Sequence, residues 1–321
     1  MTVPENALFA LAAAASWGGG DFSGGMGVKA AGGTSTGALR LVILAHAMSF
    51  TVLTILCIAT GAAWPHGAGV FWALAAGVAA GVSLTAFYMS LARGAMGVSA
   101  AISGVLAATI PAVVSMFVEG APGVLRLAGF AVALAAIWVI AAGDSPENGD
   151  MRCEMRDVKE NAERTSNLIS RISHLTSGTM ALAIVGGLGF GFYFVALRMA
   201  NGLGVMEPIA IARAASLVTC LLLLAVLSWR AKSSETPAAS APWFSPAIFV
   251  CALGVALLDT GGNLLLVAAT RAGRLDVAAV LASLYPAATI LLAAWRLHEY
   301  PTKRQLAGMI AALVAVVMIT L

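Results

Sequence analysis

The sequence predicts an all-α polytopic membrane protein with ten transmembrane helices, arranged as two inverted five-helix repeats. Three observations support this prediction: an apolar composition, ten hydrophobic segments of membrane-spanning length, and a similarity between the two halves of the chain. Of the 321 residues, 60% are hydrophobic and 10% are charged, whereas soluble domains carry about 25% charged residues. Because a soluble globule of this size cannot bury so much apolar surface, the composition excludes one.

Ten apolar segments are long enough to cross a bilayer as helices, since about 20 helical residues span the hydrocarbon core. They lie at residues 7–27, 36–60, 68–92, 97–118, 123–142, 179–200, 205–228, 245–270, 275–296 and 303–321. None of them alternates between polar and apolar residues over about ten positions, as the strands of a membrane β-barrel do. We therefore expect ten helices.

A polar segment divides the chain into two halves. Residues 143–178 contain five basic and seven acidic side chains. We expect a first five-helix repeat at 7–142, a polar charged linker at 143–178, and a second five-helix repeat at 179–321. An exposed amphipathic helix is expected within the linker, over residues 151–175.

The two halves resemble each other in sequence. Corresponding residues recur at spacings of 173 to 180 positions: Arg40 and Arg213, Ser103 and Ser283, the tetrapeptide Ala-Ala-Thr-Ile at 107 and 287, and Glu119 and Glu299. An odd number of helices in each repeat gives the two repeats opposite orientations in the membrane. Secondary transporters use this arrangement, with the substrate site near mid-depth at the repeat interface.

The end of the second half carries a family resemblance. The stretch from Leu284-Tyr-Pro286 through His298-Glu299 to Gln305-Leu-Ala-Gly308 resembles the repeat ending of the EamA family of the drug/metabolite transporter superfamily. The first repeat departs from this pattern, because Leu106 stands where the second repeat has Pro286. The resemblance implies five plus five helices and alternating-access export or exchange of small metabolites such as amino acids. It does not identify the substrate.

Polar side chains within the apolar segments are candidates for the site, because they are costly in hydrocarbon. Asp259 lies near the middle of its segment, and Asn263 lies one turn later on the same helix face. We expect Asp259 to face a wet cavity, to pair with Arg213 or with the amine of a substrate, or to stay protonated. The last of these would allow coupling to protons. The alternative is a structural aspartate that bonds to a neighbouring helix.

Further polar candidates come from both halves. Asp21 lies in the Gly-rich end of the first helix, where it either faces the cavity or is solvated near the headgroups. Arg40 and Arg213 could together bind a carboxylate through their planar guanidinium groups, or each could extend to the membrane interface or bond to backbone carbonyls of its own protein. The aromatic and hydroxyl candidates for the cavity are Trp17, Tyr88, Phe190, Tyr193, Tyr285 and Ser283. Aromatic residues in membrane helices can also serve in packing.

Two glutamates and one histidine have structural explanations. Glu119 and Glu299 fall at helix junctions, each shortly before a proline. A carboxylate there can cap the free amides of the next helix. His46 is expected to be a hydrogen-bonded interior histidine.

The motifs of several function classes are missing from the sequence. It contains no P-loop, no His-Glu-x-x-His motif and no Cys/His cluster that could bind zinc. We therefore expect a secondary transporter rather than an enzyme, with no cofactor and no metal. The alternative is an intramembrane enzyme acting on a lipid or another membrane substrate.

The expected partners are a small-molecule substrate, the lipid bilayer and protons as the coupling ion, with no nucleic acid and a monomeric state. We expect a multi-pass protein of a bacterial inner membrane. Its orientation is open: 13 of the 18 Lys and Arg residues lie nearest the odd-numbered connections, which the positive-inside rule places in the cytoplasm. The family resemblance instead implies that both termini lie inside.

Overall fold

The computed structural model describes residues 4–63, 65–93, 96–141, 162–232, 245–297 and 303–320. All regular structure in these ranges is helical, which confirms the expected all-α class. The first half contains α1 (Glu5–Ala30), α2 (Ser35–Ala59), α3 (Ala68–Arg93), α4 (Met96–Val118) and α5 (Val124–Ala141). The second contains α7 (Ala162–Met199), a short 3-10 helix η1 (Asn201–Leu203), α8 (Glu207–Lys232), α9 (Pro246–Ala272), α10 (Leu275–Ala282), α11 (Tyr285–Leu297) and α12 (Lys303–Thr320).

The described helices have the length and surface of a membrane protein. Six are long and apolar enough to cross a bilayer, and shorter apolar helices lie at residues 102–118, 124–139 and 306–319. Large apolar side chains cover the outside of the bundle; Phe117, for example, is 87% exposed and Trp295 is 77% exposed. Because water does not favour so much exposed apolar surface, the chain is an integral membrane protein with several spans.

Each expected segment lies on a helix, with two differences. The segment expected at 275–296 is divided into α10 and α11. Pro286 has no amide hydrogen to donate to the carbonyl of Ala282, which favours an interruption of the helix at this point. In the first half, α4 is continuous across Leu106, the residue that stands in place of that proline.

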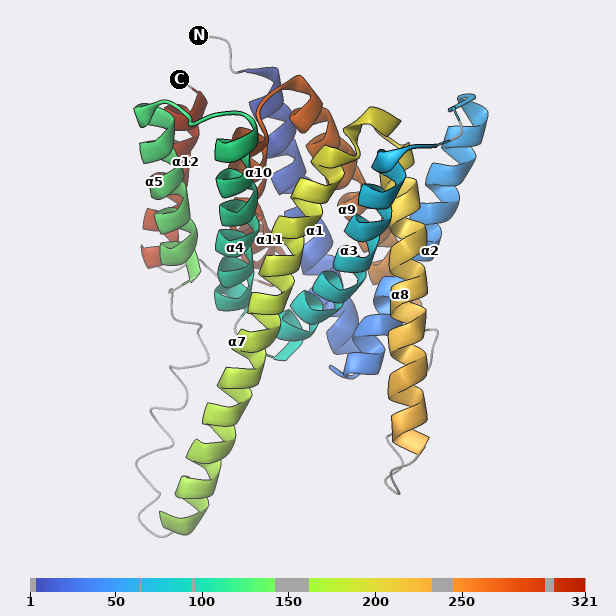
Figure 1. The fold of residues 1–321 in the computed structure, drawn as a ribbon. Coiled ribbons are helices and arrows are strands. Elements are labelled where there is room, and N and C mark those ends of the chain that lie inside the picture. Colours follow the sequence, from blue (N-terminus) through green and yellow to red (C-terminus); the bar gives the residue numbers. More distant parts are fainter. Residues whose placement is uncertain are drawn as a thin grey trace.

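The second difference is α7, which begins at Ala162 and therefore includes part of the expected linker. The helix expected at 151–175 is present over residues 162–175, where it continues without a break into the membrane span; residues 151–161 lie outside the described ranges. No proline interrupts the sequence from 162 to 199. The N-terminal part of α7 projects beyond the rest of the bundle (Figure 1).

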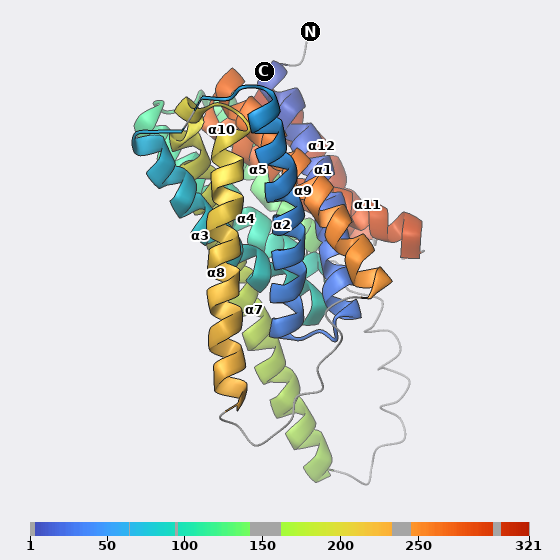
Figure 2. The same ribbon diagram turned by 90° about the vertical axis from the view of Figure 1, so that its right-hand side faces the viewer.

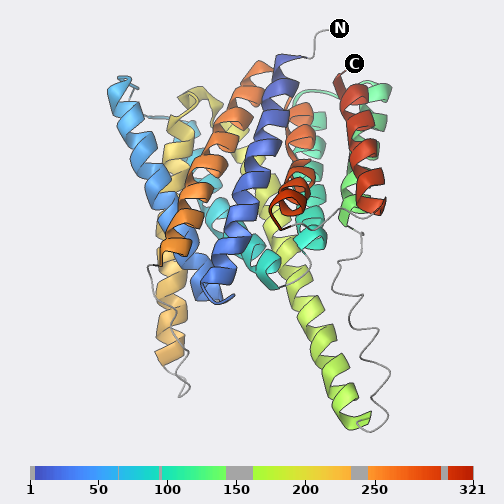
Figure 3. The ribbon, with the colours of Figure 1, turned by 180° about the vertical axis from the view of Figure 1, so that it is seen from behind.

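The helices pack mainly across the two halves. The main pairs across the halves are α1 with α9, α10 and α11, α3 with α7 and α8, α4 with α7 and α10, α2 with α8 and α9, and α5 with α12. Helices α2 and α8 lie side by side in Figure 2, and α1 and α9 do so in Figure 3. The chain enters α1 and leaves α12 at the same end of the bundle, whereas α7 begins at the opposite end (Figure 1). The first helices of the two halves therefore run in opposite directions.

Close packing between α3 and α8 depends on Gly77. A Cβ atom at this position would lie 2.2 Å from the carbonyl oxygen of Ala212. No real side chain fits at that distance unless one of the two backbones moves. Gly178 on α7 is the matched contrast, because it is exposed and a Cβ there would meet nothing within 4 Å.

We predict opposite effects for alanine at these two glycines. Gly77→Ala should lower the free energy of unfolding by about 1–3 kcal/mol, since overpacking outweighs the better helix propensity of alanine. Gly178→Ala should leave it unchanged or raise it by about 0.5–1 kcal/mol. Thermal unfolding of both variants in detergent measures the difference, and equal stability of the two would contradict this account of the α3–α8 contact.

Candidate functional site

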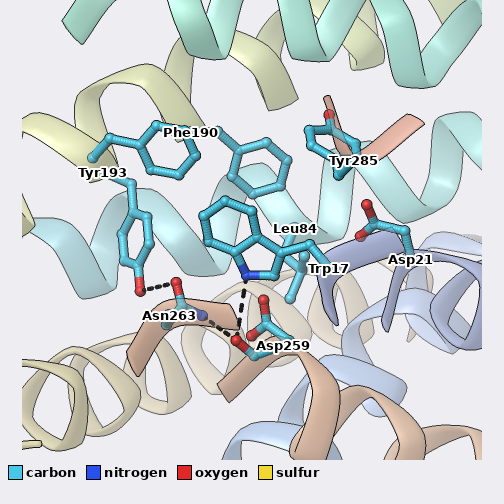
Figure 4. A pocket seen from close by; sticks show the side chains of 9 residues that line it. Trp17, Asp21, Leu84, Phe190, Tyr193, Asp259, Asn263 and Tyr285 are labelled. Carbon is cyan, nitrogen blue, oxygen red and sulfur yellow. Dashed lines mark hydrogen bonds between the residues drawn. The ribbon is translucent and has the colours of Figure 1, made fainter. Parts of the chain in front are cut away.

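A cavity lies inside the bundle, enclosed by helices from both halves (Figure 4). It holds about 340 Å³ of space free of atoms, including its opening. Its lining residues are Trp17 and Asp21 of α1, Leu84 of α3, Phe190, Tyr193 and Phe194 of α7, Asp259 and Asn263 of α9, and Tyr285 of α11. The lining is thus mostly aromatic, with two carboxylates and one amide.

Trp17 is fixed on two sides. Its ring stacks on Phe194 with the centroids 5.2 Å apart and the planes 2° from parallel. Its indole nitrogen donates to the backbone carbonyl of Asp259, 3.3 Å away. The ring also lies over Gly262, where a Cβ atom would come within 2.5 Å of it. Only glycine at 262 therefore allows α1 and α9 to approach this closely.

Asn263 and Tyr193 form the polar wall of the cavity. The Tyr193 hydroxyl donates to Oδ1 of Asn263 at 2.9 Å, and Nδ2 of Asn263 donates to the backbone carbonyl of Asp259 at 2.6 Å. Both side chains are buried. This wall brings α7 and α9 together within the second half.

Arg213 lies behind Asp259 and is only 2% exposed. Its Nη2 forms an ion pair with the Asp259 carboxylate. Its Nη1 is 2.8 Å from Nε2 of His46, and its Nε donates to the Ser49 hydroxyl at 3.2 Å. All three guanidinium nitrogens are thus engaged, by side chains of α2 and α9. Of the alternatives open for Asp259, the structure shows pairing with Arg213.

The same contacts determine the tautomer of His46. A guanidinium can only donate hydrogen bonds, so Nε2 of His46 must accept and carries no proton. Nδ1 then carries the proton and donates to the Ser216 hydroxyl, 2.7 Å away. His46 is therefore a neutral interior histidine, as the sequence suggested. It connects α2 to α8.

Asp21 differs from Asp259 because it has no partner among the described residues. It is 8% exposed, so it is buried in the cavity and not solvated at the headgroups. Among the described residues its carboxylate forms no hydrogen bond and no ion pair, and it points toward the cavity (Figure 4). One turn later, Gly24 lies against the ring of Tyr88, which a Cβ atom would approach to 2.3 Å.

Four of the expected site residues do not line the cavity. Arg213 is separated from it by Asp259, and Tyr88 is fully buried against Gly24. Arg40 does not join Arg213 in the site, so a carboxylate held by both guanidinium groups is not supported. Ser283 is buried at the break between α10 and α11, where its hydroxyl has no hydrogen-bond partner among the described residues.

Leu84 and Phe194 line the cavity without having been expected there. Phe194 follows Phe190 by four positions, so the two share a helix face. This spacing was the available signal for Phe194. Nothing in the sequence distinguishes Leu84 from the other leucines.

A second polar cluster lies at the end of the bundle where the termini lie. The Glu119 carboxylate accepts hydrogen bonds from the Ser115 hydroxyl at 2.8 Å, from Arg198 at 3.0 Å and from the amide of Leu275 at 3.0 Å. Leu275 is the first residue of α10. Glu119 was expected to cap the helix that follows it in the chain; instead it caps a helix of the other half.

Arg274 strengthens this junction. It pairs with Asp276 at 2.7 Å, and it donates to the backbone carbonyls of Glu119 and Gly120 at 3.1 and 2.7 Å. The α4–α5 connection is thereby tied to the start of α10. Glu299, the counterpart of Glu119 in the second half, lies outside the described residues.

Comparison with known proteins places the second half in a family. The model of the EamA-like transporter family matches residues 177–321. Over these residues the chain is similar to the EamA-like transporter family. The match confirms the resemblance seen in the sequence.

The similarity to solved structures extends beyond the half that matches the family model. One solved structure, titled only as a crystal structure of a protein, superimposes with a TM-score of 0.65 at 15% identity, over 100% of this chain and 99% of its own. At this identity the likeness concerns the fold alone, and it extends over both halves. A search of curated proteins gives no significant match.

Breaking the Arg213–Asp259 pair in the EamA-like half should be strongly destabilising. Arg213→Gln or Asp259→Asn alone leaves a buried charge without its partner, at a cost of about 3 kcal/mol or more. The double variant removes both charges and should be at least about 1 kcal/mol more stable than the sum of the two single costs predicts. Unfolding of the three variants in detergent measures this coupling; purely additive costs would contradict it.

Glu119 should make the stability depend on pH. Burial on its own would raise the pKa of Glu119, but the hydrogen bonds from Ser115, the Leu275 amide and Arg198 hold it below its ordinary value of 4.5. Its contacts therefore stabilise the fold fully above about pH 4.5 and lose this effect as the pH falls through the lowered pKa.

Glu119→Gln should consequently lower the melting temperature at pH 7 and reduce the further loss between pH 7 and about pH 3.5. Glu5→Gln, an exposed carboxylate on α1, is the control and should leave both quantities unchanged. An unaltered acid-induced loss in Glu119→Gln would assign the pH dependence to other groups.

Proposed function

We propose that the chain is a secondary transporter that moves small metabolites, such as amino acids, by alternating access between two inverted five-helix repeats. In this arrangement α10 and α11 together form the ninth of ten transmembrane helices. The family of the second half supports transport, and the helix contacts support the repeats.

The helix contacts support a twofold relation between the halves. When each helix is replaced by the helix at the same position in the other half, the same set of contacts results. Exchange converts the α1–α9 contact into α7–α3, the α2–α9 contact into α8–α3, and the α1 contact with α10 and α11 into α7–α4; every one of these contacts is present. The pairs α2–α8 and α5–α12 exchange into themselves. Random packing of ten helices would not produce this set.

The observation that carries the proposal is the position of the cavity. It lies where α1, α3, α7 and α9 meet, and these four helices are the ones exchanged by the twofold relation. Inverted-repeat transporters place the substrate site at such an interface. An enzyme is not proposed, because no observation favours one.

We further propose that the Glu119 cluster closes the cavity toward the end where the termini lie. It joins α4 of the first half to α7 and α10 of the second. A transporter must break such a connection in order to open on that side.

The proposed coupling ion is the proton, and the proposed location is a bacterial inner membrane. Asp259 is compensated by Arg213, whereas Asp21 has no partner among the described residues. We therefore propose Asp21 as the proton carrier, in place of the sequence-based proposal of Asp259.

Transport in proteoliposomes tests this function. With an imposed pH gradient, addition of a transported solute from a panel of amino acids and amines should move protons through the wild type and through Glu5→Gln. Asp21→Asn should lose coupled proton movement, because an amide cannot exchange a proton at this site. If no solute in the panel moves through the wild type, the proposed function fails; if Asp21→Asn stays coupled, Asp21 is not the carrier.

A further inference from the structure

The lining of the cavity carries negative charge without a matching positive one. Two of its nine side chains are carboxylates and none is Lys, Arg or His. Arg213 offsets Asp259, but all its nitrogens are engaged and it is 2% exposed. The remaining charge is that of Asp21, so an anionic ligand would meet repulsion with no basic side chain to offset it.

Most hydrogen-bond donors of the lining are also occupied. The indole N–H of Trp17 and an amide hydrogen of Asn263 both donate to the backbone carbonyl of Asp259. The Tyr193 hydroxyl donates to Asn263, and the Tyr285 hydroxyl donates to the backbone carbonyl of Ala100 at 3.3 Å. The Asp21 carboxylate, an acceptor, is left over. A ligand that donates hydrogen bonds fits this cavity better than one that accepts them.

Asp21 itself requires a cation. A carboxylate within the hydrocarbon region costs several kcal/mol unless its charge is neutralised. Asp21 is more than nine-tenths buried, points toward the cavity, and has no partner among the described residues. The protein thus provides Asp259 with a guanidinium but leaves Asp21 to a cation from outside the chain.

Aromatic rings surround the place that such a cation would occupy. Trp17, Phe190 and Tyr285 line the same cavity as Asp21 (Figure 4). The faces of aromatic rings attract ammonium groups, and this attraction grows when water is excluded. Rings and carboxylate together form a site for an organic cation rather than for a strongly hydrated metal ion.

We infer that the cavity binds a small organic amine as its ammonium cation, with the ammonium group on Asp21 and the carbon skeleton between the aromatic rings. This inference rests on the proposed function and names the substrate class of its site. It narrows the proposed substrates from small metabolites in general to those with a net positive charge.

Equilibrium binding to the purified full-length protein in detergent tests this inference without requiring transport. Three probes with one skeleton differ in charge: phenethylamine is cationic, 2-phenylethanol is neutral and 3-phenylpropionate is anionic. Calorimetry should show the amine binding at least about tenfold more tightly than the other two. Asp21→Asn should weaken amine binding at least about tenfold, whereas Glu5→Gln on the same helix should bind like the wild type.

The melting temperature of Asp21→Asn distinguishes a ligand-binding aspartate from a structural one. Because this substitution removes an uncompensated charge, the variant should unfold at the same temperature as the wild type or a higher one. A structural aspartate would show the reverse, and a lower melting temperature would therefore count against the inference. Equal binding of 2-phenylethanol, tighter binding of 3-phenylpropionate, or unchanged amine binding by Asp21→Asn would overturn it. So would failure of both phenethylamine and tetramethylammonium to bind the wild type.

The binding and transport experiments together distinguish a wrong amine site from a wrong assignment as a transporter. If the liposomes transport an anion or a zwitterion and Asp21→Asn binds it normally, transport stands and the amine site falls. If phenethylamine binds through Asp21 but no solute crosses the membrane, the amine site stands and transport falls.

Discussion

The guanidinium of Arg213 imposes the constraint from which the site follows. A buried cation in hydrocarbon must be compensated, and here Asp259 supplies the opposite charge while His46 and Ser49 accept its remaining hydrogen bonds. These groups come from α2 and α9, so the charge fixes both helices against α8. The position of α9 in turn determines where the carbonyl of Asp259 lies, and both Trp17 and Asn263 bond to that carbonyl. One wall of the cavity is therefore built outward from Arg213.

The proposed twofold relation applies to the helix contacts but not to the charges. Arg40 corresponds to Arg213 in the sequence, yet it does not line the cavity. At the spacings of 173 to 180 positions that relate the halves, residues 79–86 stand opposite Asp259 and include no Asp or Glu, so the first half cannot form the same ion pair. The first half contributes Asp21 instead, and among the described residues no cation of the second half pairs with it. Equivalent helices thus place different chemistry on the two sides of one cavity.

Hydrophobic length was sufficient to predict the helices, because about 20 apolar residues have few alternatives in a membrane. The i, i+4 spacing likewise predicted that Asp259 and Asn263 share a site. The inward face of each helix was harder to predict, since a helix that is apolar all round carries little periodic signal. This explains why Tyr88 and Arg40 were expected in the cavity and Leu84 was not. The contact of Glu119 with Leu275 spans 156 positions and joins the two halves, so no local pattern could indicate it.

The contrast between the two carboxylates bears on how a transporter of this kind would work. The carboxylate of Asp259 is paired with Arg213 within the protein. Among the described residues Asp21 has no cationic partner, so in the proposed site it is neutralised by a ligand. A ligand that binds the folded state alone adds its binding free energy to stability. An empty cavity with an ionised Asp21 would have to close around an unpaired charge, which is unfavourable at low dielectric. Closure is therefore favoured only when a cation, either an amine or a proton, occupies the site. Because burying an unpaired Asp21 carboxylate costs free energy, such a transporter would complete its cycle only by exchanging one bound cation for another.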